Sequence, residues 1–247
     1  MINKIWTKTE IMRLMKILSF LHTVKNAPYV HWSSAQPLNL KPKPLTLLLL
    51  ILGLSIFGLG ESILIASGIG VSPWTVLAQG VSNYTNWSIG LSTFVLSIGV
   101  LLTWIPLKQK PGIGTILNAL IIALVIEMSL PYLPQQNAYF RQILQVTAGV
   151  ALVGVGSGLY LTANLGAGPR DGLMLGLQKI SNRPIAQVRT TLEVSVVIIG
   201  WLMGGIVGLG TVIFALGVGP FVSLSFLLVR KFSKPSIRHR KKILTKD

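Results

Sequence analysis

Four charged residues in otherwise apolar sequence are the first candidates for chemistry. Arg170 and Asp171 are adjacent within GAGPRDG, residues 166–172. Arg189 and Glu193 follow four positions apart, so on a helix their side chains share one face and can pair. The four groups fit an internally neutralised structural network, a lipid headgroup site, or an anion or proton-coupled site. In the last of these the two arginines donate and Glu193 titrates.

Other chemistry finds little support in the composition. The chain has no cysteine, which excludes disulfides, thiolate metal ligands and cysteine nucleophiles. His22, His31 and His239 lie in the polar ends, so no buried imidazole serves a zinc ion or a serine nucleophile. No GxxxxGK[ST] phosphate-binding segment occurs. We expect no cofactor, no metal and no enzymatic activity, since a membrane-embedded enzyme would have to use Asp, Glu and Arg alone.

Long apolar stretches must position these residues. Of the 247 residues, 51% are hydrophobic, and the mean hydropathy of +0.67 is too high for an ordinary soluble domain. A helix needs about 20 apolar residues to cross about 30 Å of hydrocarbon. The sequence predicts an all-α polytopic membrane protein with six transmembrane helices, at about 45–67, 88–106, 112–131, 142–164, 185–205 and 207–229.

The formal net charge of +16 is concentrated at the two ends of the chain. Seven of the 22 basic residues precede position 45, and eight follow position 229. This distribution fits anionic lipid headgroups as partners and argues against nucleic acid. Basic residues also alternate between the predicted loops, being absent from 68–87 and present in 165–184. By the positive-inside rule, both termini are expected in the cytoplasm.

The two ends are predicted to lie outside the membrane-spanning region. Residues 1–44 form a basic extension, in which 10–24 has the apolar spacing of an interfacial helix. An unstructured extension is the alternative. Residues 230–247 form a basic cytoplasmic tail.

An internal repeat organises the region between the ends. Residues 58–120 align without a gap on 154–216, 96 positions later. We therefore divide this region into repeat 1, residues 45–131, and repeat 2, residues 142–229, each with three spans. Because three is odd, repeat 2 is expected to cross the membrane in the opposite sense, as in many secondary transporters. A duplication kept only for packing is the alternative. The identities include Gly58/Gly154, Gly60/Gly156, Gly70/Gly166, Pro73/Pro169, Gly80/Gly176, Asn86/Asn182 and Gly112/Gly208.

Each repeat has a proline followed by a segment too short to span the bilayer. Pro73 precedes WTVLAQGVSNYT, and Pro169 precedes RDGLMLGLQKIS. Proline at the first helical position predicts two short helices, re-entrant or interfacial, on opposite membrane faces, with free amides that favour an anion. Repeat 1 offers Trp74, Thr75, Thr93 and Ser97 where repeat 2 has its charges. The candidate substrate-binding residues are Gly168, Pro169, Arg170, Asp171, Gly172, Arg189, Glu193, Pro73, Trp74, Thr75 and Ser97.

Three further features are interpreted structurally. Glu61 and Glu127 fall toward the outer ends of their spans, where snorkelling to water is the simpler explanation. The glycine patterns at 154–158 and 200–208 favour close helix packing. Pro220 is expected to kink or break the last span.

Three segments together resemble the YczE/YitT family of bacterial integral membrane proteins, and most closely its YczE branch. They are GAGPRDG, VRTTLE at 188–193 and GWLMGGIVGLGT at 200–211. The resemblance covers about residues 45–225 and implies a bacterial plasma-membrane protein, in a family whose molecular activity is not established. Members often have Asp after Pro-Trp, where this chain has Thr75, which weakens the case for a charged outer site. The positions that match the family pattern are Gly168, Pro169, Arg170, Asp171, Gly172, Arg189 and Glu193, with Pro73 and Trp74 in the first half.

Two functions are open at this point. The first is a transporter or permease-like protein with a site for a small solute between the repeats. The second is a non-transporting accessory or scaffold protein that binds a membrane enzyme or anionic lipid at its cytoplasmic face. The sequence leaves the identity of the solute and the oligomeric state open.

Overall fold

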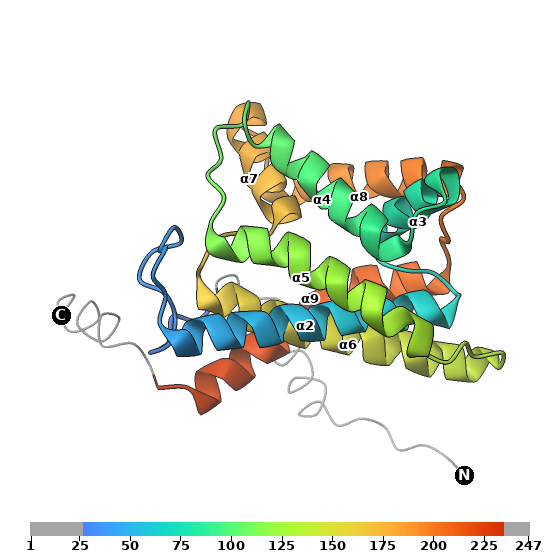
Figure 1. Ribbon diagram of the computed structural model, residues 1–247, viewed down its shortest axis with the longest axis horizontal. Coiled ribbons are helices and arrows are strands. Elements are labelled where there is room, and N and C mark those ends of the chain that lie inside the picture. Colours follow the sequence, from blue (N-terminus) through green and yellow to red (C-terminus); the bar gives the residue numbers. More distant parts are fainter. Residues whose placement is uncertain (1–26, 235–247) are drawn as a thin grey trace, which may run out of the picture.

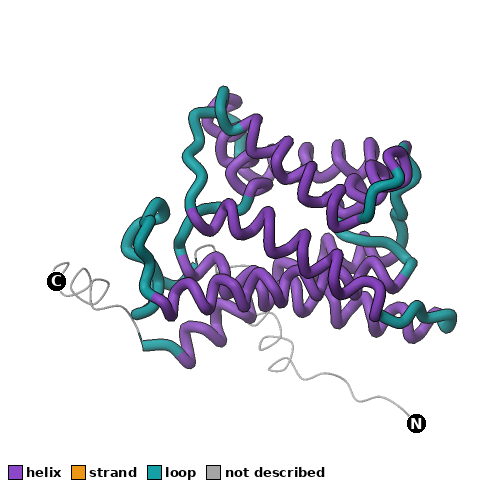
Figure 2. The backbone as a smooth tube through the Cα atoms, viewed as in Figure 1, coloured by secondary structure: helices purple, strands orange, loops and turns teal. Residues whose placement is uncertain are grey.

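The computed structural model describes residues 27–234, and the predicted interfacial helix at 10–24 lies outside this range (Figure 1). In the described range the chain forms helices joined by loops (Figure 2). The helices are α2 (Pro44–Ser67), α3 (Pro73–Thr85), α4 (Ile89–Thr103), α5 (Ile113–Ser129), η1 (Leu130–Tyr132), α6 (Tyr139–Ala163), α7 (Pro169–Ser181), α8 (Ile185–Leu202) and α9 (Leu209–Phe232).

The long helices have the length and apolarity needed to cross a membrane. Helices α2, α6, α8 and α9 pass this test alone, as does α5 together with η1. Helix α4 has only 15 residues, fewer than the predicted span 88–106, because the chain turns after Thr103. Helices α3 and α4 pass the test together as a pair bent by 112°. The described chain thus has five candidate spans, or up to six, which confirms the prediction of an all-helical, multi-pass membrane protein.

Each of the two short helices begins at a proline and is followed by a residue in the left-handed conformation. Helix α3 begins at Pro73 and α7 at Pro169, where the fixed φ of proline suits the first helical position. Each has 13 residues and is followed by an asparagine in the left-handed conformation, Asn86 with φ 58° and Asn182 with φ 52°. Both predicted short helices are therefore present, and their bounds lie 96 positions apart.

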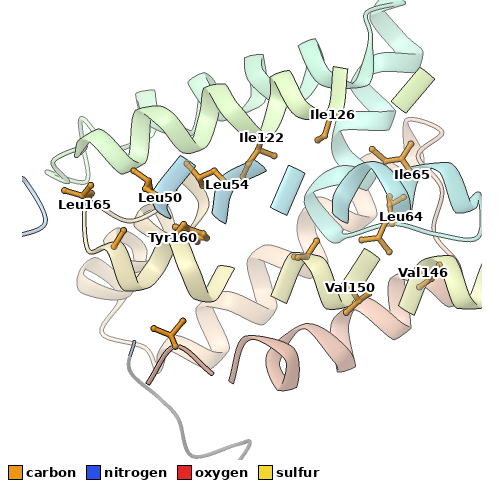
Figure 3. Packing of buried hydrophobic residues seen from close by; sticks show 14 of the residues in the cluster. Leu50, Leu54, Leu64, Ile65, Ile122, Ile126, Val146, Val150, Tyr160 and Leu165 are labelled. Atoms are coloured by element: carbon orange, nitrogen blue, oxygen red, sulfur yellow. The ribbon is translucent and has the colours of Figure 1, made fainter. Parts of the chain in front are cut away.

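The core forms where α2 crosses α6 along facing glycines. A Cβ added to Gly60 would lie 2.7 Å from the carbonyl oxygen of Gly149, and one added to Gly156 would lie 2.6 Å from the amide nitrogen of Phe57. The two backbones are therefore in direct contact, which confirms the packing interpretation of residues 154–158. Apolar side chains of α2, α5 and α6 fill the space around the crossing (Figure 3), among them Leu50, Leu54, Leu64, Ile122, Ile126, Val146 and Val150.

Four long helices lie side by side in the order α5, α2, α6 and α9, and α3 and α7 lie toward opposite ends of the molecule (Figure 1). The two ends of the described chain meet. The His31 amide donates to the Lys234 carbonyl at 3.0 Å, and Trp32 Nε1 donates to Ser233 Oγ at 3.1 Å. The two ends of the described range therefore lie beside each other.

The described part of the N-terminal extension, residues 27–43, is a loop that packs against the helices. Trp32 is buried, and the Ser34 amide donates to the Ala163 carbonyl at 2.9 Å. The partner lies at the end of α6, far along the chain, so local sequence carried no signal for this contact.

The last helix does not break at its proline. Helix α9 continues from Leu209 to Phe232 through Pro220. Proline leaves the carbonyl of Leu216 without its helical donor. Membrane helices tolerate such a loss because neighbouring groups and local adjustments satisfy the freed carbonyl.

Candidate functional site

A cavity of about 380 Å³ lies where the two short helices begin. Pro73 and Trp74 of α3 line it, together with Arg170 and Asp171 of α7 and Gly168 just before α7. Its other walls come from α2, α4, α5, α6, α8 and α9. Both halves of the chain therefore bound one space.

The first turns of α3 and α7 meet at this cavity. The guanidinium carbon of Arg170 lies 5.4 Å from the centroid of the Trp74 ring, within the range of a cation–π contact. Each of these residues is the second of its helix, and they are 96 positions apart. The positive ends of two helix dipoles therefore lie beside the same cavity.

Eight of the eleven predicted site residues line this cavity. They come from four separate parts of the sequence, the starts of α3 and α7 and one turn each of α4 and α8. The eight are Pro73, Trp74, Ser97, Gly168, Arg170, Asp171, Arg189 and Glu193.

The other three predicted residues lie behind the lining. Trp104 Nε1 donates to the Pro169 carbonyl at 3.0 Å, and the same indole covers Gly172 so closely that a Cβ there would overlap the ring. Thr75 is buried and donates to Glu61 at 2.7 Å. Sequence reasoning included them because they adjoin lining residues, but adjacent positions on a helix face different sides.

A single direct ion pair joins two members of the predicted four-membered charge network. Arg189 Nε lies 2.8 Å from Glu193 Oε1, the pair predicted from their spacing, and this is the one salt bridge within residues 27–234. Asp171 accepts a hydrogen bond from the Tyr160 hydroxyl at 2.8 Å. Arg170 stacks on an aromatic ring instead of pairing with a carboxylate.

The snorkelling interpretation of Glu61 is wrong. Its side chain is 1% exposed, and its Oε2 accepts hydrogen bonds from Ser72 Oγ at 2.9 Å and Thr75 Oγ1 at 2.7 Å. The chain folds back after α2, so the hydroxyls that begin α3 cover this carboxyl. Position along a span does not reveal such a return. Glu127, in contrast, is exposed, as its snorkelling interpretation requires.

One cation lies among the acidic groups of the site. Arg170 lines the cavity together with Asp171 and Glu193. Its guanidinium lies over Trp74, and Ser72 and Thr75, close to Trp74 in the chain, are the residues that contact Glu61. Among the residues that the structure describes, Arg170 holds no carboxylate in a direct ion pair.

Many lining positions occur in pairs 96 residues apart. Equivalent positions of the two halves thus face a single space, although their residue types differ. At six of these seven pairs repeat 1 supplies a hydroxyl, amide or aromatic group, whereas repeat 2 supplies the three charged groups, Arg170, Arg189 and Glu193. The pairs are Phe57/Val153, Ser72/Gly168, Trp74/Arg170, Thr93/Arg189, Ser97/Glu193, Asn118/Phe214 and Ile122/Val218.

The two halves differ in how their last two helices pack. Helix α4 packs against α5, whereas α8 packs against α3 and α7 without a comparable contact to α9. Gly219 of α9 lines the cavity, is exposed, and would have nothing within 4 Å of an added Cβ. Within the described part of the chain, nothing packs over the cavity at Gly219, on the side where α8 and α9 are apart.

Comparison with known protein families identifies the family of this chain. It matches the model described as "Family of unknown function (DUF6198)" over residues 45–226. The chain belongs to this family. Every residue that lines the cavity, from Phe57 to Phe226, falls within the part that DUF6198 covers.

Bacterial relatives cover most of this DUF6198 chain. It is 40% identical over 218 residues to an uncharacterised protein of Haemophilus influenzae, covering 88% of this chain and 98% of the relative. It is 31% identical over 189 residues to the uncharacterised membrane protein YczE of Bacillus subtilis, covering 74% and 82%. The predicted resemblance to the YczE branch is thereby confirmed. No solved structure matches this chain.

Sequence reasoning missed several polar lining residues of this DUF6198 member, among them Tyr160 and Asn118. Tyr160 comes from α6 and Asn118 from α5, both within apolar spans. A lone polar side chain inside an apolar stretch was the available signal in each case. The apolar lining residues, such as Phe57, carry no such signal, because nothing local separates them from lipid-facing residues.

Proposed function

We propose that this membrane protein is a transporter or permease-like protein that binds a small anionic solute in the cavity between its halves. The observation that carries the proposal is the meeting of the first turns of α3 and α7 beside Arg170. Helix amino-terminal ends offer unpaired amides and a positive dipole end, which favour anions. Secondary transporters place discontinuous helices of this kind at the bilayer midplane.

The internal correspondence supports an inverted repeat. The bounds of α3 and α7 and seven pairs of lining positions are offset by 96 residues. Helices α3 and α7 lie toward opposite ends of the molecule although their first turns meet, which favours two re-entrant helices entering from opposite membrane faces (Figure 1). The basic termini and the basic loop at 165–184 lie in the cytoplasm of a bacterial plasma membrane under this proposal.

The unequal packing of the two halves supports alternating access. In transporters built from inverted repeats, one repeat or bundle moves against the other around a fixed site. A single state is then expected to be asymmetric, as observed for α4 on α5 and for α8 apart from α9. The opposite state would open α4 from α5 and close α8 on α9.

A binding screen on the full chain tests the proposal. Purified protein is heated in the presence of inorganic phosphate, sulfate and a panel of small carboxylates, and the melting temperature is recorded. Arg170→Ala should lose any anion-dependent stabilisation, whereas Arg141→Ala, which removes an exposed arginine outside the cavity, should keep it. Uptake of the best anion into proteoliposomes should fail in the first variant alone. Equal uptake by wild type and Arg170→Ala would reject the site.

The alternative is a non-transporting accessory or scaffold protein. The net charge of +16, concentrated at the chain ends, favours a basic surface for a partner or for anionic lipid. A stoichiometric membrane partner in a pull-down, together with no anion-dependent stabilisation, would support this alternative over transport. We propose no enzymatic role.

A further inference from the structure

Glu61 is the one ionisable group of the first half that lies in the interior without a role in the proposed anion site. It belongs to α2, is 1% exposed, and does not line the cavity. Its Oε1 has no hydrogen-bond partner in the described structure. A buried carboxylate oxygen without a donor is costly, whereas the carbonyl oxygen of a neutral carboxyl loses much less.

One oxygen of this carboxyl and two neighbouring hydroxyl oxygens form a closed triangle. Ser72 Oγ lies 2.9 Å from Glu61 Oε2, Thr75 Oγ1 lies 2.7 Å from the same atom, and the two hydroxyls are 2.9 Å apart. Two hydroxyls carry only two protons for three contacts. A proton on Oε2 supplies the third. In this neutral form the carboxyl donates to Ser72 Oγ, Ser72 donates to Thr75 Oγ1 and Thr75 donates to Oε2, so that each oxygen donates once and accepts once.

We propose that Glu61 is the proton-binding group of this protein and that the proton and the solute anion bind cooperatively. The proposal rests on the anion site proposed above. Loss of the proton breaks the carboxyl O–H bond, passes the proton to water, and leaves a carboxylate that only nearby positive charge can stabilise.

Arg170 provides the link between the two ligands. Its guanidinium lies 5.4 Å from the centroid of the Trp74 ring, and the residues on either side of Trp74 that contact Glu61 are Ser72 and Thr75. Both Arg170 and Ser72 line the cavity. The other helices packed against α2 also carry titratable groups. Tyr160 of α6 is hydrogen-bonded to Asp171, and Glu127 of α5 is exposed. An anion held by Arg170 offsets its charge, which makes the carboxylate form of Glu61 less favourable. Since linkage is reciprocal, the proton in turn favours the anion.

Infrared spectroscopy of the full chain tests the proton site without any ligand. At neutral pH we expect the carbonyl band of a protonated carboxyl group, shifted by incorporation of ¹³C-labelled glutamate and absent from Glu61→Gln. Glu127→Gln, the matched control at an exposed carboxyl, should retain the band. The isotope label assigns the band to glutamate even where a variant fails to fold. A wild-type spectrum without the band, or a band that survives in Glu61→Gln, would overturn the proposal.

The same infrared band tests whether proton binding and anion binding are coupled. In Arg170→Ala the band should persist to a pH higher by about one unit or more, because an opposite charge nearby shifts ionisation by this much. In wild type, sulfate at saturating concentration should likewise let the band persist to a higher pH. Identical loss of the band in wild type and Arg170→Ala overturns the coupling. A shift in Arg170→Ala without any effect of sulfate contradicts the anion site and leaves the proton site standing.

Discussion

The first turns of α3 and α7 are anchored by the same kind of contact made from opposite sides. In the first half the carboxyl belongs to the long helix, as Glu61, and the hydroxyls of Ser72 and Thr75 begin the short one. In the second half the carboxylate begins the short helix, as Asp171, and the long helix supplies the Tyr160 hydroxyl. A carboxyl–hydroxyl bond thus ties each short helix to its long neighbour, whichever helix carries the acid.

The difference lies in what each short helix presents to the cavity. Helix α3 presents the Trp74 ring, and α7 presents the Arg170 guanidinium at the equivalent position. Thr93 and Ser97 of α4 likewise stand where α8 has Arg189 and Glu193. Similar backbones therefore hold an aromatic, hydroxyl-lined wall opposite a charged wall. Four predictions test how far the two halves are equivalent, in order of decreasing effect.

Valine at either of two equivalent glycines should prevent folding. Gly60→Val and Gly156→Val each place a side chain into the backbone of the facing helix. A Cβ at Gly60 would lie 2.7 Å from the Gly149 carbonyl oxygen, and one at Gly156 would lie 2.5 Å from the Gly53 carbonyl oxygen. We expect each to cost at least about 3 kcal/mol, beyond ordinary overpacking. Size-exclusion chromatography should show no monodisperse protein. Gly99→Val, at a helical glycine with nothing within 4 Å, should leave the elution profile unchanged. A folded Gly60→Val protein would contradict the crossing geometry.

Alanine at the two equivalent loop glycines should destabilise both halves to the same degree. Gly70 has φ +118° and Gly166 has φ +116°, and an added Cβ would meet Thr211 or Thr115 at 2.9 or 2.7 Å. Strained backbone costs about 1–3 kcal/mol, so each variant should melt measurably earlier. Gly68→Asn is the matched control, since the equivalent position already holds Asn164 in the left-handed conformation. Unequal losses would show that the loops are not equivalent.

Removing one hydroxyl from each of these carboxyl–hydroxyl contacts should show whether the accepting carboxyl group is charged or neutral, because a hydrogen bond to a charged acceptor contributes more to stability. Tyr160→Phe removes a bond to the Asp171 carboxylate and should cost about 1.5–3 kcal/mol. Thr75→Val removes a bond to Glu61 and should cost about 0.5–1.5 kcal/mol if that carboxyl is neutral. Chemical denaturation gives both values. A larger loss for Thr75→Val would argue that Glu61 is ionised.

Breaking the ion pair of α8 should have the smallest effect on stability. The side chains of Arg189 and Glu193 are 54% and 32% exposed, and pairs of this kind contribute about 0–1 kcal/mol. Arg189→Gln should therefore melt close to wild type while weakening anion-dependent stabilisation. A large loss of stability would assign this pair to the fold and not to the site.

Local patterns in the sequence determined the helices and their spacing. Apolar runs and the prolines that begin α3 and α7 predict where these helices lie, because such signals act within one or a few turns of the chain. The offset of 96 residues predicts that the short helix of the first half recurs in the second. The Arg189–Glu193 pair was predictable for the same reason, as residues four apart on a helix share a face.

Tertiary structure alone decided which groups meet. The contact of Arg170 with Trp74, the burial of Glu61 under α3 and the bond from Tyr160 to Asp171 join different helices. Their formation depends on how the helices cross and on the return of the chain after each long helix. No spacing rule within a single helix carries that information, so the same acidic residue in a span is compatible with a snorkelling side chain or with a buried proton site.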